Sequence, residues 1–127
     1  MNWDINIIID NILKTESVDY SKKSSVKTYN KAVVRVNEQV KKIDFENSKE
    51  LSVFRNLMNN DNFVVRAQAA MILIRLVKMD KDELVSCIST LTEAISLMSG
   101  DIRITYELWF DFWKQGKYLV VANEFPR

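Results

Sequence analysis

The chain has 127 residues, a formal net charge of +1 at pH 7, one cysteine, two glycines, one proline and no histidine. This length supports one domain with its own hydrophobic core, and so few glycines and prolines favour long helices over a strand-rich fold. The lack of histidine removes the commonest general base and metal ligand. The composition therefore argues against an enzyme, and we expect no cofactor and no bound metal, because no phosphate-binding glycine loop or metal cluster can be written from it.

The sequence carries no signal for a membrane or for export. Its longest apolar stretches fall short of the roughly 20 residues that a membrane span requires. Asp4 and Asp10 interrupt the N-terminal segment, where a signal peptide has a basic region and then an unbroken apolar one. The single cysteine, Cys87, cannot form an internal disulfide and is expected to be a buried small hydrophobe. We therefore expect a cytoplasmic protein with no membrane partner.

Hydrophobic periodicity predicts about six helices, the first two in the N-terminal third. The first spans residues 3–14, where isoleucines recur every three or four positions. A polar segment at 15–25 reads mostly as a loop. The second helix runs from Val26, with valines at alternating steps of three and four that form a narrow seam for a neighbouring helix.

The central part of the chain predicts an antiparallel helix hairpin. Ser48 is expected to cap the third helix, which ends in a polar turn. Asn60, Asp61 or Asn62 can cap the fourth helix, which carries a long aliphatic run. Because the turn between the two helices is short, they should form a hairpin centred on 48–78.

The last part of the chain has its own helix start and stop signals. Asp80 followed three residues later by Glu83 resembles a capping box ahead of the fifth helix. Gly100 supplies a left-handed stop for that helix, Asp101 is expected to cap the sixth, and Gly116 closes it.

These elements predict the fold class and the domain organisation. The fold is expected to be all-α, with about six helices in antiparallel hairpins that form one domain over 1–127. A short α-solenoid and a bundle both fit this helix count. The tail 117–127 is compatible with a strand-like arm or with a packed coil.

The stretch DNFVVRAQAAMILIRL resembles part of a known repeat. Its aspartate, Val-Arg pair, two alanines and leucines are spaced like those in the second helix of a HEAT repeat, over about one repeat. The resemblance implies that Ala69 and Ala70 let a paired helix approach closely. It also implies that Asp61 and Arg66 bond to turns and to neighbouring repeats, so that Arg66 is a structural residue.

The layout of most of the chain extends this resemblance. Together with Trp113-Lys114-Gln115-Gly116, it looks similar to a small bacterial HEAT-like domain of unknown function, whose members close with a Trp-Arg/Lys-x-Gly motif. Small helical proteins of this type resemble immunity proteins, as in contact-dependent growth inhibition, which neutralise one cognate toxin. The resemblance implies a non-catalytic protein-binding module with a protein toxin as its partner.

Charge is unevenly distributed along the chain. Residues 17–42 contain seven basic and two acidic residues, whereas residues 80–111 contain seven acidic and two basic ones. Four of the basic residues recur at every fourth position and so share one face of the second helix: Lys23, Lys27, Lys31 and Arg35. This face is either solvated and balanced by the acidic half, or a site for an anionic partner. Nucleic acid is the less expected partner, because a pI of 7.8 is below the strongly basic range.

The acidic half provides a second set of candidates for partner binding: Asp82, Glu83, Glu107 and Asp111. They could imitate nucleic acid against a basic cleft of a nuclease. The alternative is that they serve helix starts and surface ion pairs, since Glu107 and Asp111 have Arg103 and Lys114 at helical spacing.

The sixth helix has more apolar surface than one packed face requires. Trp109 and Trp113 are candidate hot-spot residues for a partner or a dimer. The alternative is that the tail and the first helix cover them, since large aromatic side chains in small domains usually belong to the core.

Three functions remain in competition. The first is an immunity-type protein that binds and inhibits a toxin. The second is a nucleic-acid-binding HEAT-like module with its basic stripe on phosphates. The third is a structural scaffold or a homodimer that associates through the sixth helix.

Overall fold

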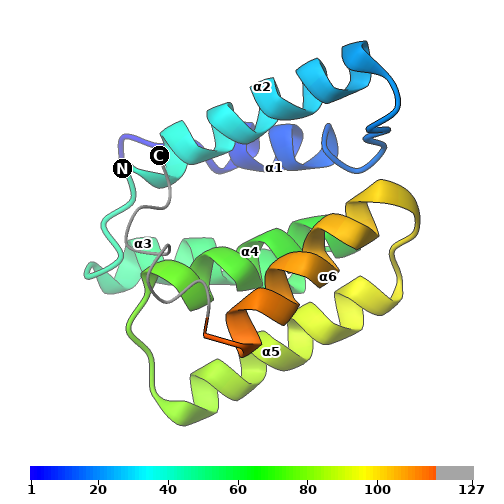
Figure 1. The fold of residues 1–127 in the computed structure, drawn as a ribbon. Helices are drawn as coiled ribbons and strands as arrows, with labels where there is room; N and C mark the ends of the chain where they lie inside the picture. Colours follow the sequence, from blue (N-terminus) through cyan, green and yellow to red (C-terminus); the bar gives the residue numbers. More distant parts are fainter. Residues whose placement is uncertain (117–127) are drawn as a thin grey trace.

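A computed structural model of the protein describes residues 1–116, and all of their regular structure is helical (Figure 1). The elements are α1 Ile5–Leu13, α2 Lys23–Val40, α3 Ser48–Arg55, the 3-10 helix η1 Asn56–Asn59, α4 Phe63–Leu76, α5 Lys81–Ser96 and α6 Gly100–Lys114. The predicted all-α class with six helices is confirmed. The expectations for the tail 117–127 lie outside the described residues.

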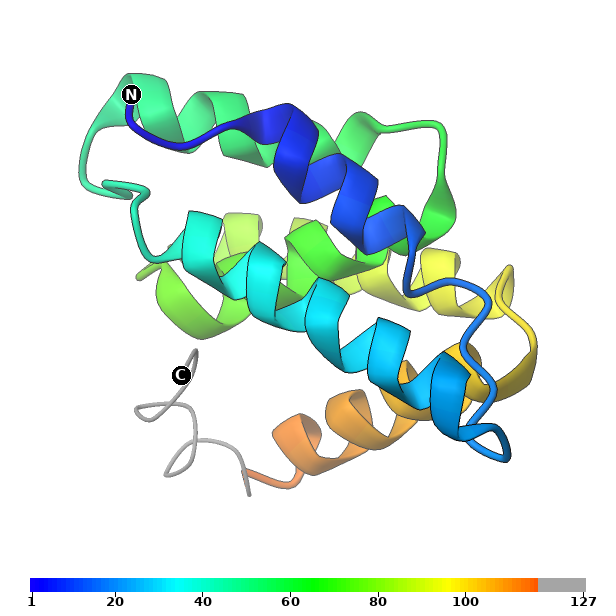
Figure 2. The same ribbon diagram turned by 90° about the horizontal axis from the view of Figure 1, so that it is seen from above.

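The helices are arranged around α4. The antiparallel pair α1 and α2 lies on one side of α4, and α5 packs along another side with the most extensive helix contact in this part of the chain (Figures 1 and 2). Helix α3 and η1 lead into α4, and α6 returns along α5. Every helix among residues 1–116 is too short or too polar to span a bilayer.

Helix α4 is buried on most of its circumference. Seven of its fourteen residues are buried, and Ala67, Ala69 and Ala70 have no exposed surface. A helix that is apolar all round is typical of a position inside a domain. Small side chains let neighbouring backbones come close, and α4 makes its most extensive contact with α5.

Helix caps decide where α3 and α4 begin. Asn47, rather than the predicted Ser48, caps α3, because its Oδ1 accepts hydrogen bonds from the backbone N–H groups of Lys49 and Glu50, both at 3.0 Å. Among the three candidates for α4, Asn62 is the cap. Its Oδ1 accepts from the N–H groups of the second and third helical residues at 2.8 and 3.1 Å.

The start of α5 is as predicted and the start of α6 is not. Asp80 caps α5 by accepting from the backbone N–H of Glu83 at 2.9 Å. Asp101 does not cap α6. Its carboxylate instead accepts from the backbone N–H of Tyr20, in the α1–α2 connection, at 2.7 Å. Gly100 has the predicted left-handed conformation, with φ +70°, but it is the first residue of α6 and not the stop of α5, which ends at Ser96.

Candidate functional site

Four basic residues of α2 form an exposed surface, called here the basic face: Lys23, Lys27, Lys31 and Arg35. All four side chains are exposed. The ion pairs among residues 1–116 join other groups, namely Arg55 with Glu83, Arg103 with Glu107 and Lys114 with Asp111. The basic face is thus a row of cations that form no ion pair within the described part of the chain.

A hollow of about 300 Å³ lies where the basic face meets α1, and is called here the basic hollow. Its lining residues are Asn11, Lys14, Thr28, Lys31, Ala32 and Arg35. Asn11 is only 4% exposed, and its Nδ2 donates to the carbonyl of Ile7 at 2.8 Å. Three cations and no carboxylate are among the lining residues within 1–116, so these residues favour an anionic group.

The acidic candidates are mostly engaged in ion pairs. Three of the four have a basic partner, with N–O distances of 2.9 Å for Glu83 to Arg55, 3.5 Å for Glu107 to Arg103 and 3.5 Å for Asp111 to Lys114. Asp82 is exposed and has no such neighbour within residues 1–116. The predicted ion pairs of Glu107 with Arg103 and of Asp111 with Lys114 along α6 are confirmed.

The tryptophans of α6 lie inside an aromatic cluster. Trp109 is 7% exposed and Trp113 is half-buried. The Trp113 ring stacks on Trp109 at 6.3 Å and on Phe110 at 6.1 Å between ring centroids. Trp109 is therefore not on an open surface. The exposed apolar side chains of α6 are instead Ile104 and Leu108.

The residues singled out by the repeat resemblance lie around the turn before α4. Nη1 of Arg66 donates to the backbone carbonyls of Asn60 at 2.8 Å and Asp61 at 3.1 Å. The Asp61 side chain is exposed, and the neighbouring Asn62 makes the cap. Arg66 thus bonds to a turn, as the resemblance implies, whereas Asp61 contributes its carbonyl oxygen.

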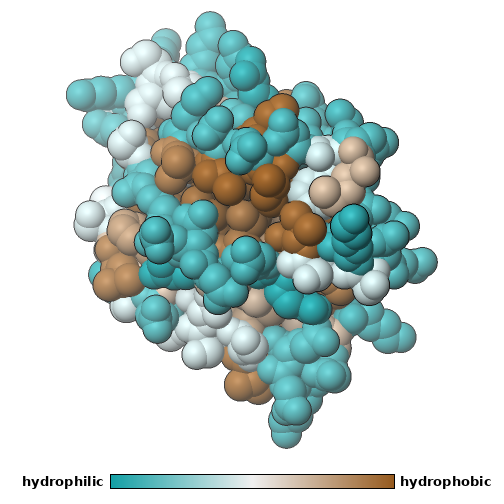
Figure 3. All heavy atoms as spheres, turned by 180° about the vertical axis from the view of Figure 1, so that it is seen from behind, coloured by the Kyte–Doolittle hydropathy of each residue, from teal (hydrophilic) through white to brown (hydrophobic). Residues whose placement is uncertain are grey.

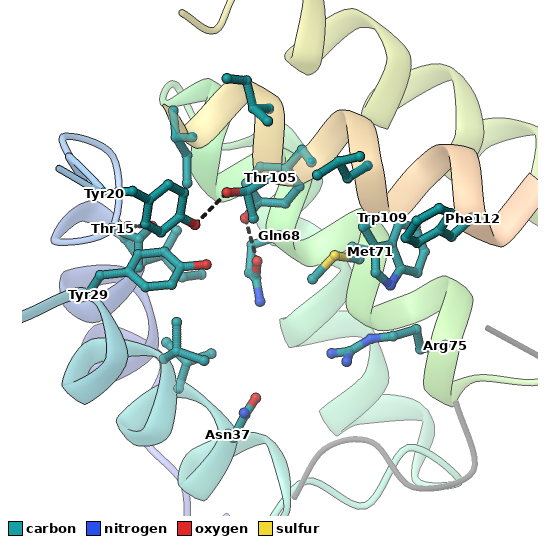
Figure 4. Close-up of a pocket in the computed structure, with 17 residues that line it drawn as sticks. Thr15, Tyr20, Tyr29, Asn37, Gln68, Met71, Arg75, Thr105, Trp109 and Phe112 are labelled. Carbon is teal, nitrogen blue, oxygen red and sulfur yellow. Dashed lines mark hydrogen bonds between the residues drawn. The ribbon is translucent and has the colours of Figure 1, made fainter. Parts of the chain in front are cut away.

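A cavity of about 490 Å³, which no sequence pattern predicted, lies between α2, α4 and α6 (Figure 4). Its lining residues come from the three helices and from the α1–α2 region: Ile12, Thr15, Tyr20, Tyr29, Val33, Val36, Asn37, Gln68, Met71, Arg75, Ile102, Ile104, Thr105, Tyr106, Leu108, Trp109 and Phe112. We call this the central cavity. Its wall is mostly aliphatic and aromatic.

Tyr20 holds the α1–α2 connection against α6 at one end of the central cavity. Its hydroxyl forms a hydrogen bond with Thr105 Oγ1 at 2.6 Å, and its backbone N–H donates to Asp101 (Figure 4). Deeper in the cavity, the Tyr106 hydroxyl donates to Oε1 of Gln68. These bonds connect residues that are far apart in the sequence, and no local sequence pattern predicts them.

Burial shifts the pKa values of Arg75, Tyr29 and Tyr106, which line the central cavity. It lowers the pKa of Arg75 to about 10 and raises the pKa values of Tyr29 and Tyr106 above their ordinary 10.0, because a charge is poorly solvated there. At neutral pH Arg75 is therefore positive and both tyrosines are neutral. Among the lining residues within 1–116, Arg75 is the one side chain that is charged at neutral pH.

The face of the molecule that is turned away from the viewer in Figure 1 carries a patch of hydrophobic side chains (Figure 3). A hollow of about 500 Å³ between α1 and the α3–η1 segment lies on this side, with Ile5, Ile9 and Val53 on its apolar wall. Asn56, Asn59 and neighbouring polar groups form its rim. Asp61 is the one charged side chain that lines it among the described residues, and these residues offer little chemistry for specific recognition.

No group of three or more potential ligands among residues 1–116 is placed to hold a metal ion. No family model matches the chain, and no curated protein or solved structure is significantly similar to it. Function is therefore inferred from the basic face and the basic hollow.

Proposed function

We propose that the protein is a non-catalytic binding module whose basic face docks on an acidic surface of a protein partner. The observation that carries this proposal is the row Lys23, Lys27, Lys31 and Arg35, which is exposed and forms no ion pair within residues 1–116. Like charges four residues apart on a helix cost stability. A partner of opposite sign offsets that cost and is steered toward this face.

The basic hollow provides a specific binding site for one acidic side chain within the docking surface. Lys14 from α1 joins Lys31 and Arg35 from α2 around a concave site of about 300 Å³. A carboxylate side chain that enters this site can meet several cationic donors at once, and charge-assisted hydrogen bonds of this kind are stronger than neutral ones.

A protein partner fits better than nucleic acid. The charge of the molecule is segregated, with a local excess of five negative charges over residues 80–111, which include α5 and most of α6. A nucleic acid longer than the basic face would meet this repulsive half, whereas a compact protein surface would not.

The finer proposal is that the partner is a bacterial toxin and that binding neutralises it. Its support is the resemblance of the chain's layout to small helical immunity proteins. Such a protein needs an exposed, charged surface for fast association and no catalytic group. The protein encoded beside this chain is then the first partner to test.

The test reverses charge on the basic face. The double variant Lys27→Glu/Lys31→Glu should keep the helical circular dichroism spectrum but bind the neighbouring gene's product at least about tenfold more slowly and no longer inhibit it. The matched control is Lys78→Glu/Lys81→Glu, which makes the same charge change on exposed side chains away from α2. Association kinetics measured by surface plasmon resonance at low and high salt would check this.

Two results would overturn the proposal. One is that the wild-type protein forms no complex with the neighbouring product and leaves its activity unchanged. The other is equal binding by the two double variants. Steeply salt-dependent binding to duplex or single-stranded oligonucleotides, measured by fluorescence anisotropy, would instead favour the nucleic-acid function.

A further inference from the structure

The basic hollow is lined by more positive charge than one carboxylate can neutralise. Lys14 of α1 and Lys31 and Arg35 of α2 line it, and all three side chains are exposed and form no ion pair within residues 1–116. Each of the two helices has one acidic residue, Asp10 in α1 and Glu38 in α2, and neither lines the hollow. The lining therefore suits an anion with more than one negative charge.

The two helices that supply these cations lie side by side, so the hollow has donors on both of its sides (Figure 2). Lys14 is the cap residue at the end of α1, and Lys31 and Arg35 are one turn apart on α2. A group with several acceptor oxygens can therefore be bound from two directions.

The rest of the lining is polar or small. It consists of Thr28, Ala32 and Asn11, whose Oδ1 is buried and whose Nδ2 donates to the carbonyl of Ile7. An amide NH₂ group has two hydrogens, so one N–H of Asn11 remains as a donor beyond that bond. The lining within residues 1–116 contains no aromatic or large aliphatic side chain. The site is thus built for a charged, oxygen-rich group and not for an apolar body attached to it.

A phosphoryl group meets these requirements better than a carboxylate does. A phosphomonoester carries a charge of about −1.5 to −2 at pH 7 and has three strong acceptor oxygens. The planar guanidinium of Arg35 can donate two parallel hydrogen bonds to two of these oxygens. The third oxygen is then free to accept from an ammonium group of Lys14 or Lys31.

We propose that the basic hollow binds a phosphoryl group, carried either by a phosphorylated side chain or by a free phosphate compound. This inference deepens the proposed docking function and rests on it in one respect, because it names the anionic group that the hollow takes. Lys31 and Arg35 also belong to the basic face. A bound phosphoryl group therefore neutralises part of the surface on which the partner docks.

Three probes test the charge requirement: the peptide acetyl-Ala-Ala-phosphoserine-Ala-Ala-amide, the same peptide with glutamate in place of phosphoserine, and inorganic phosphate. Each is titrated at pH 7.5 and low salt into the ¹⁵N-labelled full chain, and binding is followed by backbone NMR signals. We expect the phosphoserine peptide to bind at least about threefold more tightly than the glutamate peptide, because it carries up to twice the charge. The signals that shift should belong to the end of α1 and the middle of α2.

The two phosphorylated probes distinguish the two sources of the group. Tighter binding of the phosphoserine peptide than of inorganic phosphate assigns the hollow to a phosphorylated side chain. Equal or tighter binding of inorganic phosphate assigns it to a free phosphate compound.

Matched variants test the site. Lys14→Gln removes a cation that lines the hollow, whereas Lys27→Gln removes a cation of the basic face that does not line it. The first should weaken binding of the phosphoserine peptide at least about threefold and the second should weaken it less, since screening by water and salt reduces the effect of a more distant charge. Thr28→Glu adds a carboxylate to the lining and keeps all three cations, so it should abolish saturable binding of both phosphorylated probes. All three replaced side chains are exposed, so the variants should fold.

The proposal is overturned if the glutamate peptide binds as tightly as the phosphoserine peptide, or if neither phosphorylated probe binds. Equal losses of affinity in Lys14→Gln and Lys27→Gln, or binding by Thr28→Glu like that of the wild type, would overturn it as well. These results are separate from the docking test, because no probe contains the neighbouring gene's product. Docking can hold when the phosphoryl probes fail, and phosphoryl binding can hold when no protein complex forms.

Discussion

Arg66 joins the turn that precedes α4 to the helix itself. Replacing it with alanine removes two hydrogen bonds from a charged donor to the carbonyls of Asn60 and Asp61. We expect Arg66→Ala to lower the free energy of unfolding by about 1–2 kcal/mol, because the site is only partly buried. Thermal and urea denaturation followed by circular dichroism would measure this.

The control for this prediction is Arg103→Ala. Arg103 is also half-exposed, but its contacts are a 3.5 Å surface ion pair with Glu107 and a 3.4 Å hydrogen bond to the carbonyl of Met98. Its loss should cost less than that of Arg66. Binding through the basic face should be the same in both variants, and equal stability of the two would argue against the structural role of Arg66.

The buried tyrosines are expected to lower the stability of the folded protein at alkaline pH. Burial raises the folded-state pKa values of Tyr106 and Tyr29 above 10.0, so the stability they contribute is complete below pH 10 and is lost as pH rises beyond it. Arg75 acts in the opposite direction. Burial lowers its pKa to about 10, so its contribution to stability improves above that pH, where the folded protein no longer has to bury a charged guanidinium. Two tyrosines against one arginine predict a net loss of stability above pH 10.

Tyrosinate absorbance and helical circular dichroism, recorded together during alkaline titration, would check this. Ionisation of Tyr106 should appear together with unfolding, because a buried phenolate is not stable in the folded protein. Tyr106→Phe should make the stability fall less steeply with pH. Complete tyrosine ionisation with the helical spectrum intact would contradict the prediction.

Helices in this protein differ in how much of their surface is covered. Helix α4 contacts α1, α3, η1 and α5, whereas α6 packs on α5 and exposes Ile104 and Leu108. Local opening requires less free energy where fewer apolar contacts break. We expect backbone amides in the middle of α6 to exchange with solvent at least about tenfold faster than those in the middle of α4.

Hydrogen–deuterium exchange followed by mass spectrometry or NMR would measure this difference. Helix α5 is the internal control, because it packs on both α4 and α6 and should be intermediate. Equal protection of α4 and α6 would show that the described helices open as one cooperative unit.

The existence of each helix could be predicted from periodicity, but its first residue often could not. The sequence predicted Ser48 as the cap of α3, whereas the structure has Asn47 there. Both side chains can accept hydrogen bonds from first-turn N–H groups, and only the backbone conformation decides between them. Asp101 had the right residue type and place for a cap, yet its carboxylate binds the distant Tyr20. A local sequence pattern contains no information about such a contact.

For the whole molecule, the sequence predicted surfaces better than cavities. A row of charges on one face of one helix depends on helical spacing alone, so the exposure of the basic face followed from the pattern of Lys23 to Arg35. The central cavity depends on how far α6 stands from α2. That distance results from the packing of both helices on their neighbours, and Arg75 and Gln68 had no distinguishing spacing.

The two hydrogen bonds of Tyr20 connect the segment just before α2 to α6, so they link the first residues of the basic face to a helix about 80 positions further along the chain. A partner that displaces the start of α2 when it docks at Lys23 and Lys27 would therefore have to break these bonds, which costs part of its binding free energy. Replacing Tyr20 with phenylalanine would remove the bond to Thr105 and keep the backbone bond to Asp101, so it would make the start of α2 easier to displace without changing a residue of the basic face.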